Sequence, residues 1–124
     1  MKILVIEDEI LIQQSLKKLL EKMGAIVSTE SRGMEALSKI KSESFDRIVC
    51  DLMLQDITGF DIIEDSKSIF SSQEISQKFI IITAYSSEQV LTKAKDYGCI
   101  VLNKPFSDMK KALSIMFNGK DNGQ

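Results

Sequence analysis

Histidine is absent from this chain, and cysteine occurs only twice. Without histidine the chain has no His-based zinc site, no Ser-His catalytic arrangement and no side chain that carries a phosphoryl group as phosphohistidine. The two cysteines, Cys50 and Cys99, lie in or beside short apolar runs. We therefore expect small buried side chains in a reducing cytoplasm rather than a disulfide framework.

Long apolar runs and an excess of one charge are missing as well. No run approaches the ~20 residues that span a bilayer. The formal net charge is −2, with 16 basic and 18 acidic residues mixed along the chain. Such a chain has no basic field that attracts nucleic acid or an anionic membrane surface. The first residues show no signal-peptide pattern, so we expect a cytoplasmic protein that binds neither nucleic acid nor membrane.

What the chain does have is a regular alternation of apolar runs and helical patterns. Short runs rich in Ile and Val occur at 3–6, 25–29, 47–50, 79–82 and 99–102. Runs that are apolar on both faces are typical of a parallel sheet covered on both sides. The run at 25–29 is the weakest, as expected of an edge strand. Between the runs, apolar residues recur at helical spacing over 9–23, 33–42, 59–71, 86–97 and 107–117.

Five strands alternating with five helices predict a doubly wound α/β fold, a parallel sheet sandwiched between helices. At 44% hydrophobic residues, a chain of 124 residues can build one core. We therefore expect a single domain over residues 1–118, with a polar tail or linker stub at 119–124.

Acidic side chains follow two of the runs, at the edge where open parallel sheets bind ligands. Glu7 and Asp8 follow the first run, and Asp51 follows the third. Three converging carboxylates repel one another unless a cation holds them, and Mg²⁺ prefers such oxygen ligands. The ordinary alternatives are an acidic helix start for the first pair and a turn or cap for Asp51.

Two more polar residues end later runs. Thr83 follows the fourth run, and Lys104 precedes Pro105, which restricts the lysine to extended geometry. Each residue alone is typical of a strand end or a solvated turn. Together with the carboxylates and a cation, however, a hydroxyl and an ammonium can neutralise the oxygens of a transferred phosphoryl group. The combination predicts a site at which the carboxylate of Asp51 attacks phosphorus.

These motifs resemble the receiver domain of bacterial two-component response regulators, over roughly residues 2–117. The matching pieces are Ile3-Leu4-Val5-Ile6-Glu7-Asp8-Glu9, Val49-Cys50-Asp51-Leu52-Met53-Leu54 with Gly59, Ile82-Thr83-Ala84 and Lys104-Pro105-Phe106. The resemblance implies a flavodoxin-like three-layer sandwich with strand order 2-1-3-4-5.

The resemblance also implies roles for the acidic residues. Asp51 would be the phosphoacceptor. Asp8, Asp51 and the backbone carbonyl of Met53 would ligate Mg²⁺ directly, and Glu7 would assist through water.

The same resemblance implies how the signal enters and leaves. Thr83 and Lys104 would each bind an oxygen of the transferred phosphoryl group. The donor would be a sensor histidine kinase or a phosphotransfer protein. The output would reach an unknown downstream protein through the face built from residues 86–117.

Two positions depart from the family's pattern. Gln55 stands where the family usually has proline, and Val101 stands where it usually has a Tyr or Phe that moves inward with the threonine. Because valine cannot make that movement, the alternative function is a degenerate receiver that binds partners without being phosphorylated.

Two other classes of protein share parts of this pattern. A nucleotide binder of the same architecture needs a Gly-, Ser- or Thr-rich loop after the first strand, where this chain has acids. A phosphatase of the aspartyl-phosphate type typically needs a second Asp two residues after the nucleophile, where this chain has Met53. We therefore expect a signalling switch that catalyses only its own phosphorylation and dephosphorylation and is otherwise no enzyme.

Overall fold

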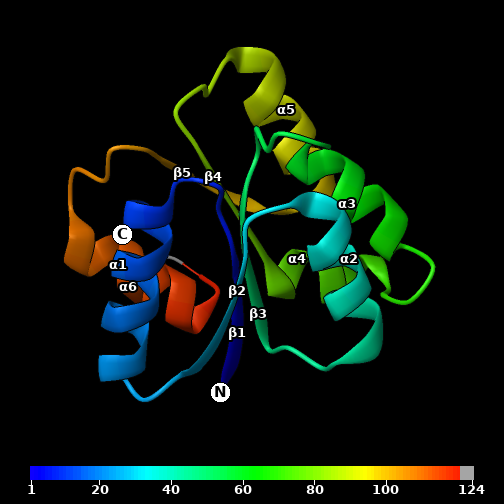
Figure 1. The fold of residues 1–124 in the computed structure, drawn as a ribbon. Coiled ribbons are helices and arrows are strands. Elements are labelled where there is room, and N and C mark those ends of the chain that lie inside the picture. The colour runs from blue at the N-terminus through cyan, green and yellow to red at the C-terminus, as the bar shows by residue number, and fades with distance from the viewer. Residues whose placement is uncertain (121–124) are drawn as a thin grey trace.

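A parallel sheet forms the middle layer of the protein (Figure 1). The structure is a computed structural model, and it describes residues 1–120. The strands are β1 (Lys2–Ile6), β2 (Ile26–Glu30), β3 (Arg47–Asp51), β4 (Phe79–Thr83) and β5 (Ile100–Asn103). Their order is β2-β1-β3-β4-β5, which confirms the predicted doubly wound fold and its strand order. Each strand begins and ends within one residue of its predicted run.

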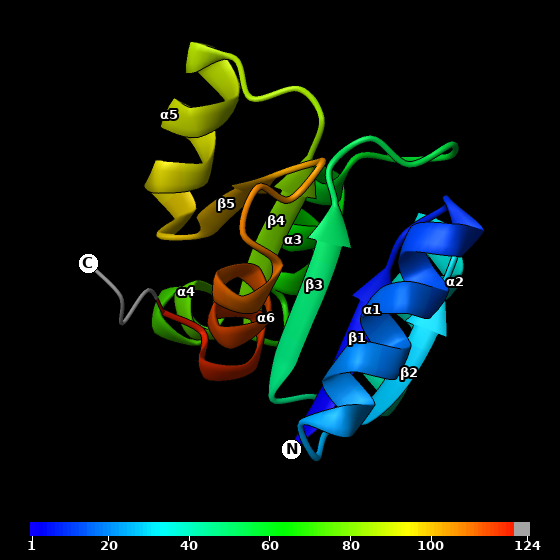
Figure 2. The same ribbon diagram turned by 90° about the vertical axis from the view of Figure 1, so that its left-hand side faces the viewer.

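Helices cover both faces of the sheet. One face carries α1 (Ile10–Lys22) and α6 (Met109–Asn118) (Figure 2). The other carries α2 (Gly33–Ser42), α3 (Gly59–Ser66), α4 (Ser72–Lys78) and α5 (Glu88–Tyr97). The described residues thus form six helices where five were predicted. No helix among residues 1–120 combines the length and apolarity needed to cross a membrane.

The extra helix corrects the prediction of one helix over 59–71. Helix α3 ends at Ser66, and α4 begins after a reciprocal cap at Ser71. The Ser71 hydroxyl accepts from the Glu74 amide, and the Glu74 carboxylate accepts from the Ser71 amide. Such a capping box starts a new helix because it satisfies amides that have no partner within the helix.

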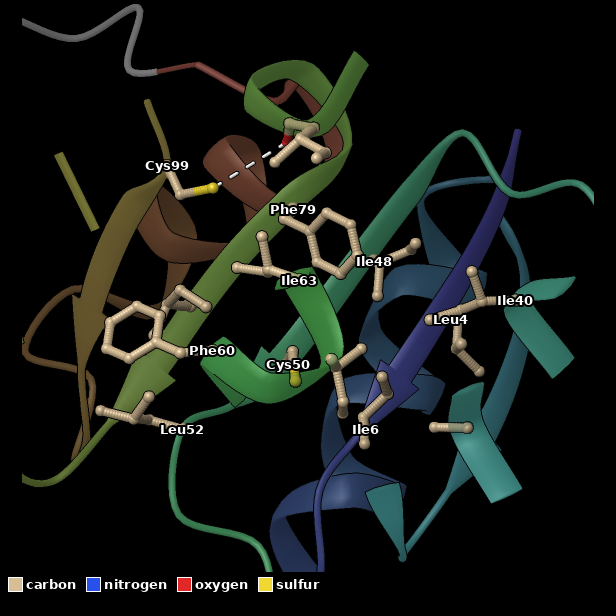
Figure 3. Packing of buried hydrophobic residues seen from close by; sticks show 14 of the residues in the cluster. Leu4, Ile6, Ile40, Ile48, Cys50, Leu52, Phe60, Ile63, Phe79 and Cys99 are labelled. Atoms are coloured by element: carbon tan, nitrogen blue, oxygen red, sulfur yellow. Dashed lines mark hydrogen bonds between the residues drawn. The ribbon is translucent and has the colours of Figure 1, made fainter. Parts of the chain in front are cut away.

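The core lies in two clusters, one on each face of the sheet. Alternate residues of a strand point to opposite faces, so β1 contributes Leu4 and Ile6 to one cluster and Ile3 and Val5 to the other. Figure 3 shows the first cluster, which includes Phe60 of α3 and Phe79 of β4. Every residue of β3 and β4 is buried, which explains why these runs are apolar on both faces.

Cys50 and Cys99 are free, buried thiols in this first cluster, as predicted. Burial raises the pKa of both thiols, that of Cys99 to about 12. Both side chains therefore remain neutral and act as small apolar groups.

A buried arginine joins the start of β3 to the ends of two helices. The Arg47 guanidinium donates to the backbone carbonyls of Met116 at 3.2 Å and Phe117 at 3.1 Å, in the last turn of α6. It also donates to the carbonyl of Gln77 in α4. These carbonyls have no partner within their helices, so Arg47 satisfies both helix ends. Burial is the main cause that lowers the pKa of Arg47.

Capping residues bound the last two helices at both ends. The side chains of Ser87 and Asp108 cap α5 and α6. Gly98 ends α5 and Gly119 ends α6, with φ angles of 74° and 77° in the left-handed region. Residues 121–124 of the predicted polar tail lie outside the described residues.

Helix α5 is weakly embedded in the fold. Ala94 is its buried residue, and residues 84–89 are all exposed. In Figure 1 the N-terminal end of α5 extends beyond the rest of the helical layer.

Candidate functional site

Three carboxylates converge at the edge of the sheet where β1 and β3 end. The two strands pair in register, with Ile6 opposite Cys50, so the residues that follow them come together. One carboxylate oxygen from each of Glu7, Asp8 and Asp51 lies within 4.8 Å of the others. The side chains of Glu7 and Asp51 are buried, and that of Asp8 is half-buried. The structure therefore brings the three predicted acids into one cluster.

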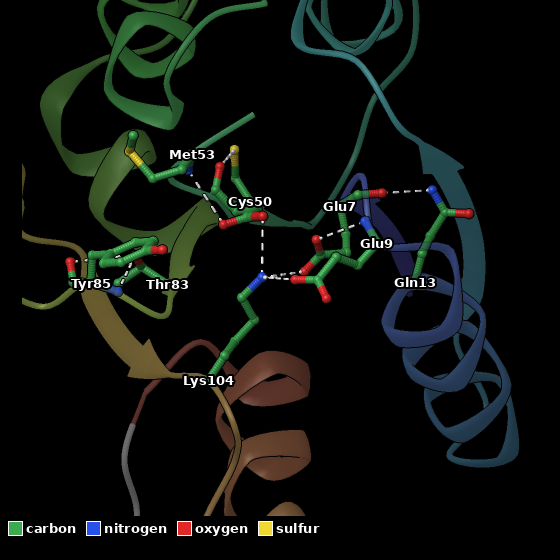
Figure 4. Close-up of polar contacts among 9 residues, drawn as sticks. Glu7, Glu9, Gln13, Cys50, Met53, Thr83, Tyr85 and Lys104 are labelled. Atoms are coloured by element: carbon green, nitrogen blue, oxygen red, sulfur yellow. Dashed lines mark hydrogen bonds and ion pairs between the residues drawn. The ribbon is translucent and has the colours of Figure 1, made fainter. Parts of the chain in front are cut away.

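Lys104 reaches into this acidic cluster from the end of β5. Its Nζ lies 2.9 Å from Glu7 Oε1 and 3.2 Å from Asp51 Oδ2. Figure 4 shows the lysine extended toward Glu7 and Glu9. Its backbone amide donates to the Thr83 carbonyl at 2.9 Å, which continues the pairing of β4 with β5 past the last strand residue. The pairing of β4 with β5 thus places Lys104 at the site.

The electrostatics of the site reflect carboxylates withdrawn from water beside one ammonium. Burial raises the pKa of Glu7, the hydrogen bond from Lys104 opposes this rise, and the neighbouring Asp51 adds to it. Burial and the adjacent Glu7 raise the pKa of Asp8. Burial acts to lower the pKa of Lys104, but the hydrogen bonds and charges of Glu7 and Asp51 outweigh it and leave that pKa above its ordinary value. Three carboxylates facing one ammonium leave an excess of negative charge that favours a further cation.

Thr83 lies at the same edge, at the end of β4. Its side chain is buried, and its hydroxyl accepts a hydrogen bond from the Tyr85 amide at 2.9 Å. Figure 4 shows Thr83 and Tyr85 on the side of Lys104 away from Glu7. The hydroxyl therefore forms a turn with its own loop and lies at the rim of the site.

Met53 begins the loop that leads from the acceptor strand to α3. Its amide donates to Asp51 Oδ1 at 3.3 Å. The loop then folds back, with a bridge between Met53 and Thr58 and a 2.8 Å hydrogen bond from the Gly59 amide to the Leu52 carbonyl. Met53 is therefore held beside Asp51, while its side chain is half exposed, at 52%.

Two residues of the site were not predicted from the sequence. Glu9 places Oε1 at 3.2 Å from Lys104 Nζ, and its amide donates to Glu7 Oε2 at 3.1 Å. Gln13 is buried, and its amide group donates to the Glu7 carbonyl at 2.9 Å and to Ser31. Glu9 could have been found from the unbroken acidic run, whereas Gln13 gives no signal beyond its place one helical turn after Glu9.

Comparison with known families gives this site its context. The family model for the response regulator receiver domain matches residues 3–115. The chain belongs to this family. The predicted family is thereby confirmed, and response regulators are signalling proteins of two-component systems.

Curated relatives and solved structures agree with the family. The transcriptional regulatory protein ZraR of Klebsiella oxytoca is 30% identical over 91% of this chain and 25% of its own length. The response regulator SaeR of Staphylococcus aureus is 31% identical over 91% of this chain and 48% of its own length. The chain spans between about a quarter and a little over half of the curated relatives it matches first. A receiver domain of the Francisella response regulator 1452 has a TM-score of 0.77 at 28% identity, covering 94% of this chain and 95% of that one.

Receiver domains bind Mg²⁺ at an acidic pocket, and the cluster of Glu7, Asp8 and Asp51 is compatible with that property. The donor set consists of hard carboxylate oxygens, which suit Mg²⁺ and are poor ligands for softer metals.

Proposed function

We propose that this receiver is a phosphorylation-dependent switch that accepts a phosphoryl group on Asp51 and then changes its affinity for a downstream protein. One observation carries the proposal. The Asp51 carboxylate lies within hydrogen-bonding distance of a buried ammonium, inside a cluster of oxygen donors. This arrangement offers a nucleophile and a means of neutralising a phosphoryl group in the same place.

Mg²⁺ is the cofactor that the donor set fits. Asp8 and Asp51 would hold the ion directly with the backbone carbonyl of Met53, and Glu7 would assist through water. When bound, the ion supplies positive charge to the oxygens of the incoming phosphoryl group. The excess negative charge of the cluster supports this assignment.

The phosphoryl donor we propose is the phosphohistidine of a sensor histidine kinase or a phosphotransfer protein. An Asp51 carboxylate oxygen attacks phosphorus, a P–O bond forms, and the P–N bond breaks with its electron pair returning to the imidazole nitrogen. Lys104 gives up part of its contact with the carboxylates and pairs with an oxygen of the new group. The Thr83 hydroxyl leaves the Tyr85 amide and donates to another oxygen.

The output surface we propose comprises residues 86–117, which include α5, β5 and α6. The exposure of α5 beyond the helical layer supports it, because an element with one buried residue can shift at little cost. A cytoplasmic location follows from the same assignment, since the kinase domains that phosphorylate receivers act there. The domain itself contributes no nucleic-acid contact in this scheme.

The test is incubation of the protein with acetyl phosphate and Mg²⁺, followed by mass spectrometry of the intact chain and its peptides. We expect one added phosphoryl group, located on Asp51 and absent from Asp51→Asn. Asp65→Asn is the matched control, because Asp65 is an exposed acid on α3. Uptake by Asp51→Asn at the wild-type rate would assign the acceptor elsewhere.

One observation favours the alternative of a phosphorylation-independent interaction module. Val101 packs against the core cluster of the α2–α5 layer, so the usual aromatic switch is replaced by an aliphatic side chain that already faces inward. A pull-down with and without beryllofluoride, a phosphoryl mimic, separates the two functions. Partners that bind equally well in both conditions would support the alternative.

A further inference from the structure

We propose that Asp56 is a positioning residue for the phosphorylation of Asp51: it fastens the loop that carries Met53 to the N-terminus of α2. This inference rests on the proposed function and adds to it a residue whose side chain does not enter the acidic cluster.

The carboxylate of Asp56 caps a helix that belongs to another part of the chain. Its Oδ1 accepts from the Gly33 amide at 2.8 Å, and its Oδ2 accepts from the Met34 amide at 2.9 Å. These are the first two amides of α2, which have no partner within the helix. The residue in the N-cap position is Arg32, whose side chain makes no capping hydrogen bond. The β3–α3 loop therefore supplies the cap that the local sequence of α2 lacks.

The packing beneath this cap requires a glycine in α2. A Cβ atom added to Gly33 would lie 2.3 Å from Ile57 Cγ1 and 2.8 Å from its Cδ1. Such distances are far below van der Waals contact. The loop thus lies directly on the helix backbone: the paired hydrogen bonds of Asp56 hold it there, and the missing side chain at Gly33 leaves room for it.

The same loop is tied to the phosphoacceptor at its other end. The Met53 amide donates to Asp51 Oδ1, and the Gly59 amide donates to the Leu52 carbonyl. Between these ties stands Gln55, which leaves φ unrestricted where a proline would fix it. The Asp56 anchor thus restrains the middle of the loop. A shift of about 1 Å in a reacting group or its supports can slow a reaction roughly a hundredfold.

The hydrogen bonds also keep the anchor charged. Desolvation acts to raise the pKa of Asp56, but hydrogen bonds from backbone amides, led by those of Met34 and Gly33, together outweigh it and lower that pKa below its ordinary value. A carboxylate at the positive end of a helix is further favoured by the helix dipole.

The experiment compares the rate of phosphorylation by acetyl phosphate at saturating Mg²⁺ in four variants of the protein. Asp56→Ala removes both hydrogen bonds, and we expect a maximal rate about tenfold below wild type. Asp56→Asn keeps one acceptor oxygen, so its maximal rate should lie between those of wild type and Asp56→Ala. Gly33→Ala leaves Asp56 in place but displaces the loop, and should slow the reaction as well. Ser71→Ala is the control, because it removes the cap of α4, which lies between α3 and β4 away from the acidic cluster.

A purely structural role gives a different pattern. In that case Asp56→Ala and Ser71→Ala would both lower the unfolding temperature while both retained the wild-type maximal rate, and the inference would be overturned. A wild-type rate in Gly33→Ala with the loop amides shifted in NMR spectra would overturn it too, since the loop would then tolerate displacement. Failure of the wild-type protein to take up phosphate would instead refute the proposed function, and the inference with it.

Discussion

Lys104 Nζ lies 3.2 Å from Asp51 Oδ2, and both side chains are nearly excluded from solvent, with 8% and 5% of their surface exposed. The ammonium therefore stands over the proposed acceptor before any phosphoryl group arrives. In this state Lys104 supplies the positive charge that the carboxylates need. The same group is already in place to meet the negative charge that phosphorylation adds.

Replacing this lysine should destabilise the protein in a way that Mg²⁺ can repair. In Lys104→Met the carboxylates of Glu7 and Asp51 lose their partner, and breaking a buried ion pair costs about 3 kcal/mol of unfolding free energy. Urea unfolding with and without Mg²⁺ measures the effect, and added Mg²⁺ should restore much of the loss. The same variant should bind the ion yet transmit little structural change on phosphorylation. The control is Lys110→Ala, which alters an exposed lysine of α6. Equal unfolding curves for the two variants would contradict a stabilising role for Lys104.

The buried acid Glu7 should give the metal-free protein a characteristic dependence on pH. Its pKa is raised above the ordinary value of 4.5 by burial, so the unfolded chain ionises first as pH increases. Stability from this group is therefore complete below 4.5 and is lost as pH rises through the folded-state pKa. Glu7→Gln should remove this loss and be more stable than wild type at neutral pH without metal.

Thermal unfolding measured from about pH 4 to about pH 8 checks this loss of stability, because a carboxyl group with a raised pKa ionises within roughly that range. Glu74→Gln serves as control because backbone hydrogen bonding from Ser71 lowers the pKa of Glu74. Its stabilising effect is present above the ordinary pKa and is lost only as pH falls through the folded-state value. A pH profile of Glu7→Gln that parallels wild type would show that Glu7 does not titrate as its burial requires.

Removing one carboxylate from the edge of the cluster should weaken the binding of Mg²⁺ without unfolding the protein. Asp8 is half-buried and its pKa is raised by burial and by Glu7, so Asp8→Asn relieves repulsion in the metal-free state. We expect Mg²⁺ affinity to fall at least about tenfold, because even the loss of an outer-shell partner of a metal ligand costs about that much. NMR titration that follows the Met53 amide provides the measurement. Unchanged affinity in Asp8→Asn would exclude Asp8 as a ligand.

The arginine between β3 and the helix ends should be a stabilising residue far from the acidic cluster. Arg47→Met keeps much of the side-chain volume but leaves the carbonyls of Met116 and Phe117 without their donor. Because a hydrogen bond from a charged donor is stronger than a neutral one, we expect the free energy of unfolding to fall by about 2 kcal/mol. Urea unfolding gives the magnitude, and hydrogen exchange in α6 shows where it acts. Arg32→Met is the control, because the Arg32 side chain is 53% exposed and makes a surface ion pair, with its Nε 3.7 Å from Glu35 Oε1. A loss no larger than that of the control would show that solvent replaces Arg47 at the helix ends.

The architecture and most of the site follow from local patterns. Apolar runs that end in Glu7, Asp51 and Thr83 place those residues at one edge of a parallel sheet, and the structure has them there. The helix that was missed, α4, did carry a signal, because Ser71 and Glu74 have the spacing of a capping box. The apolar Ile69 and Phe70 continue the helical spacing of the residues before them, and this periodicity predicts one continuous helix in spite of the cap.

What the sequence could not reveal depends on contacts between distant segments. Asp56 caps a helix that begins 23 residues earlier, and Arg47 reaches carbonyls about seventy residues later. Nothing in the local spacing of either residue points to its partner, since both contacts exist only once the sheet has set neighbouring elements side by side. The threefold contact of Lys104 with Glu7, Glu9 and Asp51 is of the same kind.

Helix α5, with Ala94 as its buried anchor, has a thermodynamic consequence for the whole domain. An element fastened near one end opens by local fluctuation at a free energy well below that of global unfolding. Its first-turn amides should be the earliest in the helical layer to exchange with deuterium, while β3 and β4 stay protected until the molecule unfolds. Native-state hydrogen exchange would then report two cooperative units: the stable sheet around β3 and β4, and helix α5, which opens separately.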